Sequence, residues 1–222
     1  MCTVVTRGTS VGVVALVLAL VARIAHAEPD NTTLVEVGLA MAPPTYVAGV
    51  SLHEGSHALM AKLVGADVEE LHLFPPGIDP HTNTFRFGWT YVSGLRTRGD
   101  RIAFFIAPKI TDTLLLGGFA ALVFTSAWPH NRYGQLALTV GATGLWIDFA
   151  KDVVLFSPTN DVSHVFSLWC MTGWKQLPAR LVYAGIAGGL AYVVVQGYEK
   201  TFTTPSSATP RTMVLPVLSA SF

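Results

Sequence analysis

Charged residues are scarce in this sequence. Asp, Glu, Lys and Arg together make up 13% of its 222 residues, which is about half the share of an ordinary soluble domain. The formal net charge is zero, so there is no excess of basic residues to bind the phosphates of a nucleic acid. Cysteine is scarcer still, and the pair Cys2 and Cys170 excludes a disulfide framework and a cysteine-rich metal site.

Apolar residues, in contrast, make up 51% of the chain and fall in long runs. A helix needs about 20 predominantly apolar residues to cross a bilayer core. We therefore predict an all-α polytopic membrane protein with about four transmembrane helices, and a membrane-embedded domain over residues 28–200. The expected spans lie within residues 34–64, 102–128, 133–156 and 181–198.

Two adjacent prolines, Pro43 and Pro44, interrupt the first of these apolar segments. Proline is tolerated in the first turn of a helix, but it disrupts the helix interior. We therefore expect the first helix to begin at these prolines and to continue for about 20 residues, with Gly65 as its stop signal.

Both ends of the chain differ from this apolar middle. Arg7 precedes an apolar run, Val11–Ala22, which has the length of a signal-peptide core. Ala25–Ala27 then fits a small-x-small cleavage site, so residues 1–27 are predicted to be a signal peptide, with an uncleaved N-terminal anchor as the alternative. Residues 201–222 are rich in Ser, Thr and Pro and are predicted to form a flexible tail.

The segment between the first two spans, residues 66–94, reads as β-structure. VEELHLF and FRFGWTYV alternate as strands do, and the turn-rich PPGIDPHTN separates them. We predict a small β-hairpin at the membrane interface, because an isolated pair of strands leaves backbone polar groups that lipid cannot satisfy. Such a hairpin offers an edge to which an extended peptide segment can add as a strand.

Basic residues are distributed unequally between the loops. Residues 65–101 hold four arginines and residues 157–180 hold Lys175 and Arg180, whereas the turn at 129–132 holds only Arg132. The positive-inside rule places the two longer loops on the cytosolic side. We expect a multi-pass protein of a bacterial inner membrane, with the active site toward the cytosolic side.

The motif HEGSH, residues 53–57, lies within the first apolar segment. Histidines four residues apart share one face of a helix, so His53 and His57 can bind one metal ion together. Two imidazoles and one further ligand suit a single Zn²⁺ ion, whose fourth position is open to water. Glu54 stands beside them and is the candidate catalytic base. Ionisable groups inside an apolar span are rare and usually functional.

A third ligand must come from elsewhere in the chain, and Asp161 is the leading candidate because it ends an apolar span on the same predicted side as His57. Asn160 beside it could bind substrate, and His164 could support the metal site or replace Asp161 as ligand. Asp152 and Asp112 are further polar residues expected to flank the site. The full set of third-ligand candidates is Asp112, Asp148, Asp152, Asp161, His72, His81, His130 and His164.

Three segments, in this order, resemble the site-2 protease family of intramembrane zinc metalloproteases. LHEGSHALMAKLVGADVEELHLF, residues 52–74, is similar to the family's H-E-x-x-H-A signature, which is followed by a basic residue, a glycine and a strand. IAPKITD, residues 106–112, resembles its A-G-P-x-x-N segment. LFSPTNDVSHV, residues 155–165, resembles its N-x-x-P-x-P-x-L-D-G-G-H segment and places Asp161 on the ligand aspartate.

The resemblance implies a three-helix catalytic core in the membrane, with zinc below the cytosolic surface. It implies a hydrolase, a metalloendopeptidase whose substrate is a transmembrane protein, unwound locally so that a peptide bond reaches the metal. Asn160 and Val162 stand where the family has leucine and glycine. The alternative function is therefore a catalytically impaired protein that binds zinc and a client helix without cleaving it. A zinc protein with a structural or transport role would not need Glu54.

Overall fold

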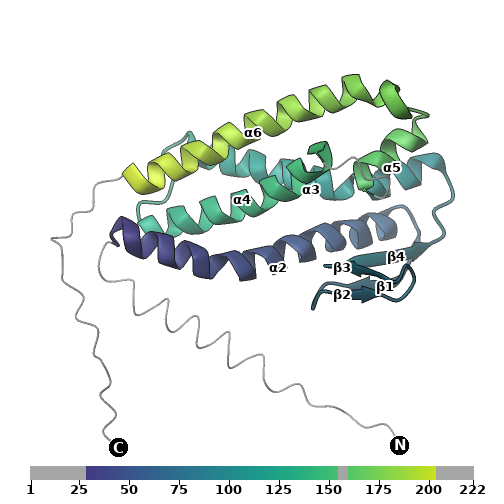
Figure 1. The fold of residues 1–222 in the computed structure, drawn as a ribbon, viewed down its shortest axis with the longest axis horizontal. Coiled ribbons are helices and arrows are strands. Elements are labelled where there is room, and N and C mark those ends of the chain that lie inside the picture. The colour runs from purple at the N-terminus through teal and green to yellow at the C-terminus, as the bar shows by residue number, and fades with distance from the viewer. Residues whose placement is uncertain (1–28, 155–159, 204–222) are drawn as a thin grey trace, which may run out of the picture.

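Four long helices make up most of the described chain, which comprises residues 29–154 and 160–203 of the computed structural model (Figure 1). A short helix, α5 (Asp161–Leu168), and a 3-10 turn, η1 (Gly173–Gln176), follow the third long helix. The prediction of a mainly helical fold is confirmed. The expected signal or anchor segment, residues 1–27, lies outside the described residues. The long helices are α2 (Asn31–Leu63), α3 (Arg98–Val123), α4 (Arg132–Val154) and α6 (Leu177–Thr203).

Helix α2 does not begin at the prolines, and on this point the prediction was wrong. It begins at Asn31, where the Asp30 side chain caps it by accepting a hydrogen bond from the Thr33 backbone N–H at 2.8 Å. It then continues through Pro43 and Pro44 for 33 residues in all. Each internal proline removes a helical hydrogen bond, and packing of α2 against α3 and α4 offsets that loss.

The other long helices fall within or close to the apolar segments that predicted them. Helix α3 begins with a capping box: the Thr97 hydroxyl accepts a hydrogen bond from the Asp100 backbone N–H, and the Asp100 carboxylate accepts one from the Thr97 backbone N–H. By length and composition, two segments of the described residues could cross a membrane: Arg98–Val123 and Gly173–Thr203. Helix α6 ends at Thr203, so the first three residues of the expected tail are helical, and residues 204–222 lie outside the described part.

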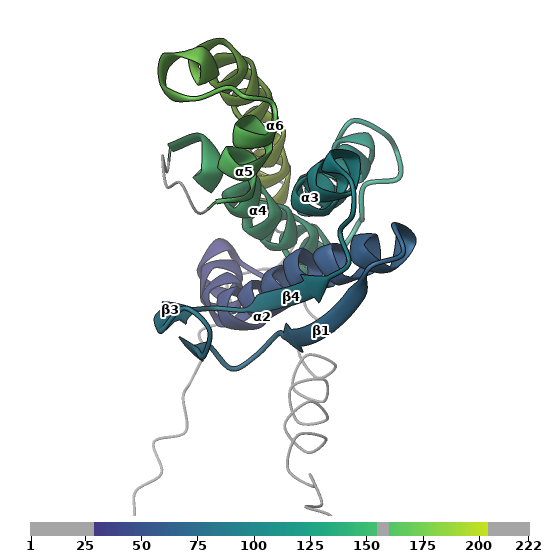
Figure 2. The same cartoon turned by 90° about the vertical axis from the view of Figure 1, so that its right-hand side faces the viewer.

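The predicted β-structure is present as two antiparallel pairs. β1 (Asp67–His72) pairs with β4 (Trp89–Ser93), and β2 (Gly77–Asp79) pairs with β3 (Thr84–Arg86). Figures 1 and 2 show these strands on the side of α2 that faces away from α6. The single strand expected for FRFGWTYV is divided between β3 and β4, because the chain approaches α2 closely at Gly88.

A buried carboxylate, Asp79, holds the two strand pairs together. It accepts hydrogen bonds from the Thr82 and Tyr91 hydroxyls, each at 2.6 Å. It also forms an ion pair with Arg86 at 3.0 Å. Burial alone would raise the pKa of Asp79. The hydrogen bonds that it accepts from Thr82, Tyr91 and the His81 backbone, together with the Arg86 charge, instead lower this pKa well below its usual value. Burial and the bond to Asp79 raise the pKa of Tyr91 to about 12.

The main hydrophobic core lies between α3, α4 and α6. Helices α3 and α6 pack closely enough that a side chain at Gly197 would meet the Phe119 ring at 2.6 Å. A smaller core of Ala61, Ala66 and Phe104 lies between α2, α3 and the chain that leads into β1. The main core comprises Leu116, Phe119, Val123, Ala142, Phe149, Ala187 and Val194.

At the end of the bundle opposite the β-strands, Arg132 joins three helix ends. Its side chain is almost completely buried. Its guanidinium donates to the backbone oxygens of Pro29 and Thr201 and to the side-chain oxygen of Asn31. We call these four residues the Arg132 cluster. It ties the start of α2 and the end of α6 to the first turn of α4.

Candidate metal centre

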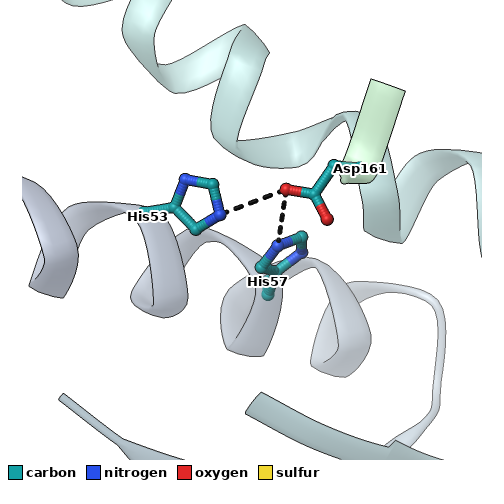
Figure 3. A group of neighbouring side chains, drawn as sticks. All are labelled: His53, His57 and Asp161. Carbon is teal, nitrogen blue, oxygen red and sulfur yellow. Dashed lines mark ion pairs between the residues drawn. The ribbon is translucent and has the colours of Figure 1, made fainter. Parts of the chain in front are cut away.

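The two histidines of the HEGSH motif point from successive turns of α2 toward one carboxylate (Figure 3). That carboxylate belongs to Asp161 in the first turn of α5. Its Oδ2 atom lies 3.1 Å from Nε2 of His53 and 3.4 Å from Nε2 of His57. We call these three residues the histidine cluster. The structure thus brings together the three residues predicted from the sequence as metal ligands, with ligand atoms within 4.8 Å of one another.

The second nitrogen of each ring is engaged elsewhere. Nδ1 of His57 donates to the backbone oxygen of Phe104 at 2.8 Å, and Nδ1 of His53 donates to Oδ2 of Asp148 at 2.9 Å. A neutral imidazole that donates through Nδ1 presents a lone pair at Nε2. Two nitrogen lone pairs and a carboxylate oxygen then converge on one point, which is an arrangement that a cation stabilises.

The spacing of these atoms fits a small metal ion. Ligands about 2.0–2.1 Å from a tetrahedral metal lie about 3.3 Å apart, close to the 3.1 and 3.4 Å observed between the cluster's nitrogen and oxygen atoms. The Nδ1 bonds also hold both rings in the orientation that ligands need. The histidine cluster could therefore hold a metal ion.

Glu54 is positioned by the β-structure. Its carboxylate accepts a hydrogen bond from the Thr90 hydroxyl of β4 at 2.7 Å. This contact requires a close approach at Gly88, where a Cβ atom would lie 2.8 Å from Val50 and 2.9 Å from Glu54. The roles of Thr90 and Gly88 were not predicted. A glycine between two strand-like runs is the signal that could have indicated such an approach.

Two hollows meet at the histidine cluster. A polar cavity of about 410 Å³ contains His53, Glu54, His57 and Asp161. An apolar groove of about 1220 Å³ runs along α2 between the β-structure, α4 and α6. His53, Glu54, Arg86 and Lys151 line both. An elongated apolar ligand in the groove could therefore present a polar group to the candidate metal centre.

Asn160 and His164 lie next to Asp161 but do not join the histidine cluster. The Asn160 side chain caps α5 by accepting the Ser163 backbone N–H at 2.7 Å. The His164 ring stacks on Phe105 of α3, with ring centroids 4.5 Å apart. Both residues line the polar cavity.

The remaining predicted residues, Asp112 and Asp152, surround a buried cation. Nζ of Lys109 lies 3.1 Å from Oδ2 of Asp152 and 3.7 Å from Oδ2 of Asp112. Its closest carboxylate is Asp148, at 2.9 Å. Asp112 and Asp152 therefore contact Lys109 and not the histidines. The sequence signal for Lys109 was an ionisable residue within an apolar span.

No protein-family model, curated protein or solved structure matches this chain. The chemistry of the site follows from its own residues.

Proposed function

We propose that this protein is a zinc-dependent intramembrane endopeptidase that hydrolyses a peptide bond in or near a transmembrane segment of another membrane protein. The observation that carries the proposal is the convergence of His53, His57 and Asp161 beside Glu54, where the apolar groove opens. A metal ligand set, a carboxylate base and an apolar channel are the parts that such a reaction needs.

Zinc is the proposed ion because two imidazoles and one carboxylate form a common catalytic zinc set. When bound, zinc lowers the pKa of its water and polarises the scissile carbonyl. Glu54 takes a proton from the attacking water and passes it to the leaving amine. The Thr90 hydroxyl holds one oxygen of Glu54, which leaves the other oxygen for the water.

The substrate is proposed to lie in the apolar groove as a helix and to unwind where it meets the polar cavity. β4 pairs with β1 alone among the described strands, so its other edge can receive the unwound segment as an added strand. Since Thr90 of β4 contacts Glu54, a segment added there would run past the catalytic base.

The proposed membrane arrangement has α2, α3, α4 and α6 as four spans of a bacterial inner membrane. The β-structure and α5 then lie at the cytosolic side with the active site. Large apolar side chains on the outer face of α6 suit contact with lipid, and in a soluble protein they would face water. They are Leu181, Val182, Ile186, Tyr192 and Val195.

Glu54→Gln tests the catalytic step. We expect the purified variant to bind zinc as the parent does and to cleave a model transmembrane substrate at least about 100-fold more slowly, because general-base catalysis contributes that much or more. Glu36→Gln is the matched control, since Glu36 is exposed on the same helix. Cleavage by Glu54→Gln at the parent's rate would show that the mechanism is wrong.

A second candidate function is a protein that binds zinc and a client helix without cleaving it. The observation in its favour is that the Asn160 amide oxygen caps α5, so this oxygen is not free to hold a substrate backbone. If the parent and Glu54→Gln both bind zinc and a transmembrane peptide, and neither cleaves it, this second function replaces the first.

A further inference from the structure

Behind the histidine cluster, one carboxylate oxygen is shared between a histidine and a lysine. Oδ2 of Asp148 lies 2.9 Å from Nδ1 of His53 and 2.9 Å from Nζ of Lys109. Lys109 also donates to the backbone oxygen of Asp148 at 2.7 Å. Lys151 binds the other carboxylate oxygen of Asp148. The three residues His53, Asp148 and Lys109 come from α2, α4 and α3.

We propose that Asp148, held in place by Lys109, is the positioning residue that makes His53 a metal ligand. A carboxylate that accepts Nδ1–H fixes the ring's orientation, keeps the Nε2 lone pair toward the metal and strengthens that nitrogen as a donor. The proposal rests only on the metal-binding part of the proposed function.

The two histidines are supported unequally, and this difference makes the proposal specific. His57 donates to the neutral backbone oxygen of Phe104 in α3, so this contact does not depend on any side chain. His53 depends on a charged side chain, and that charge is stable at this depth because a buried cation compensates it. The exposed fraction of the Lys109 side chain is 3%, against 17% for Asp148, so Lys109 has little access to water as an alternative partner.

Asp148→Asn removes the charge and nearly preserves the shape. We expect zinc affinity, measured by competition with a chromogenic chelator, to fall about 10- to 100-fold, as is typical when a partner of a ligating histidine is lost. Asp152→Asn is the matched control. Asp152 lies on the same helix and contacts the same Lys109 nitrogen, but it belongs to neither the histidine cluster nor the His53 contacts, so the parent's affinity should be retained.

A double variant tests whether Lys109 acts through Asp148. We expect Lys109→Met to weaken zinc binding, and Lys109→Met/Asp148→Asn to bind zinc no more weakly than Asp148→Asn alone, because effects on one chain of contacts do not add. Additive losses would show that Lys109 acts by another route. Thermal unfolding of the zinc-free proteins separates loss of fold from loss of metal affinity.

A third measurement uses the zinc-free protein. The ¹⁵N resonances of the His53 ring, assigned by comparison with His53→Gln, should report a proton on Nδ1 in the parent and a mixture of tautomers in Asp148→Asn. A mixture already present in the parent, or unchanged zinc affinity in Asp148→Asn, would overturn the proposal. Neither readout uses a substrate, so a failure to cleave would count against the proposed protease and leave this inference standing.

Discussion

Buried polar groups occupy both ends of the bundle, and they are satisfied in opposite ways. In the Arg132 cluster, one guanidinium donates to three oxygens that are neutral. In the histidine cluster, two ring nitrogens face an oxygen of a carboxylate, and the remaining ring nitrogens already donate elsewhere. Donors and acceptors match at the first end, whereas at the second end neutral rings leave acceptors in excess.

The difference separates a structural site from a candidate binding site. A buried group whose hydrogen bonds are complete stabilises the native state and has no capacity left for a ligand. A buried set with excess acceptors costs free energy until a cation joins it. The burial of charge alone, which is common to both ends, would not distinguish them.

The largest expected effect is the loss of metal from the histidine cluster. We expect Asp161→Ala and His57→Ala to weaken zinc binding by more than about 100-fold, because losing a ligand costs more than losing a partner of a ligand. Metal content measured by mass spectrometry on the purified protein checks this. The control is His164→Ala, which should keep its zinc. Loss of zinc from His164→Ala with retention in Asp161→Ala would reverse the assignment of the third ligand.

The next effect should fall on stability alone. Arg132→Met leaves three oxygens of the Arg132 cluster without a donor, and we expect a loss of about 3 kcal/mol in the free energy of unfolding. Zinc content per folded molecule should not change. Arg98→Met, at an exposed position of α3, should cost less than about 0.5 kcal/mol. A loss of zinc in folded Arg132→Met would show that the two ends are not independent.

The smallest expected effect concerns the proposed metal site, where a substitution should reduce activity at little cost in stability. Thr90→Val removes the hydroxyl that holds Glu54 and keeps the side-chain shape. We expect the free energy of unfolding to fall by about 1 kcal/mol and cleavage to slow about tenfold, which corresponds to about 1.4 kcal/mol in the activation barrier. Zinc affinity should remain that of the parent. Thr125→Val, remote from the site and exposed, should leave cleavage unchanged.

Several elements could be predicted because their signals are local. The apolar runs predicted the helices, and alternation around a turn-rich segment predicted the β-structure. The prediction was wrong for the start of α2, because tertiary packing offsets the helix-breaking effect of Pro43 and Pro44, and this packing cannot be read from the local sequence. The prediction also did not separate β3 from β4. The two strands are divided because the chain approaches α2 at Gly88, and the neighbouring residues in the sequence do not indicate this approach.

The sequence by itself determined that His53 and His57 share a helix face, because residues four apart must do so. It also made Asp161 the leading third ligand. Only the tertiary structure decided which polar group serves which purpose. Asp148 supports His53, while Asp112 and Asp152 surround Lys109, although all are carboxylates in or near apolar segments. The physical reason is that hydrogen bonds and ion pairs act over a few ångströms, and the packing of α2 against α3 and α4 sets these distances.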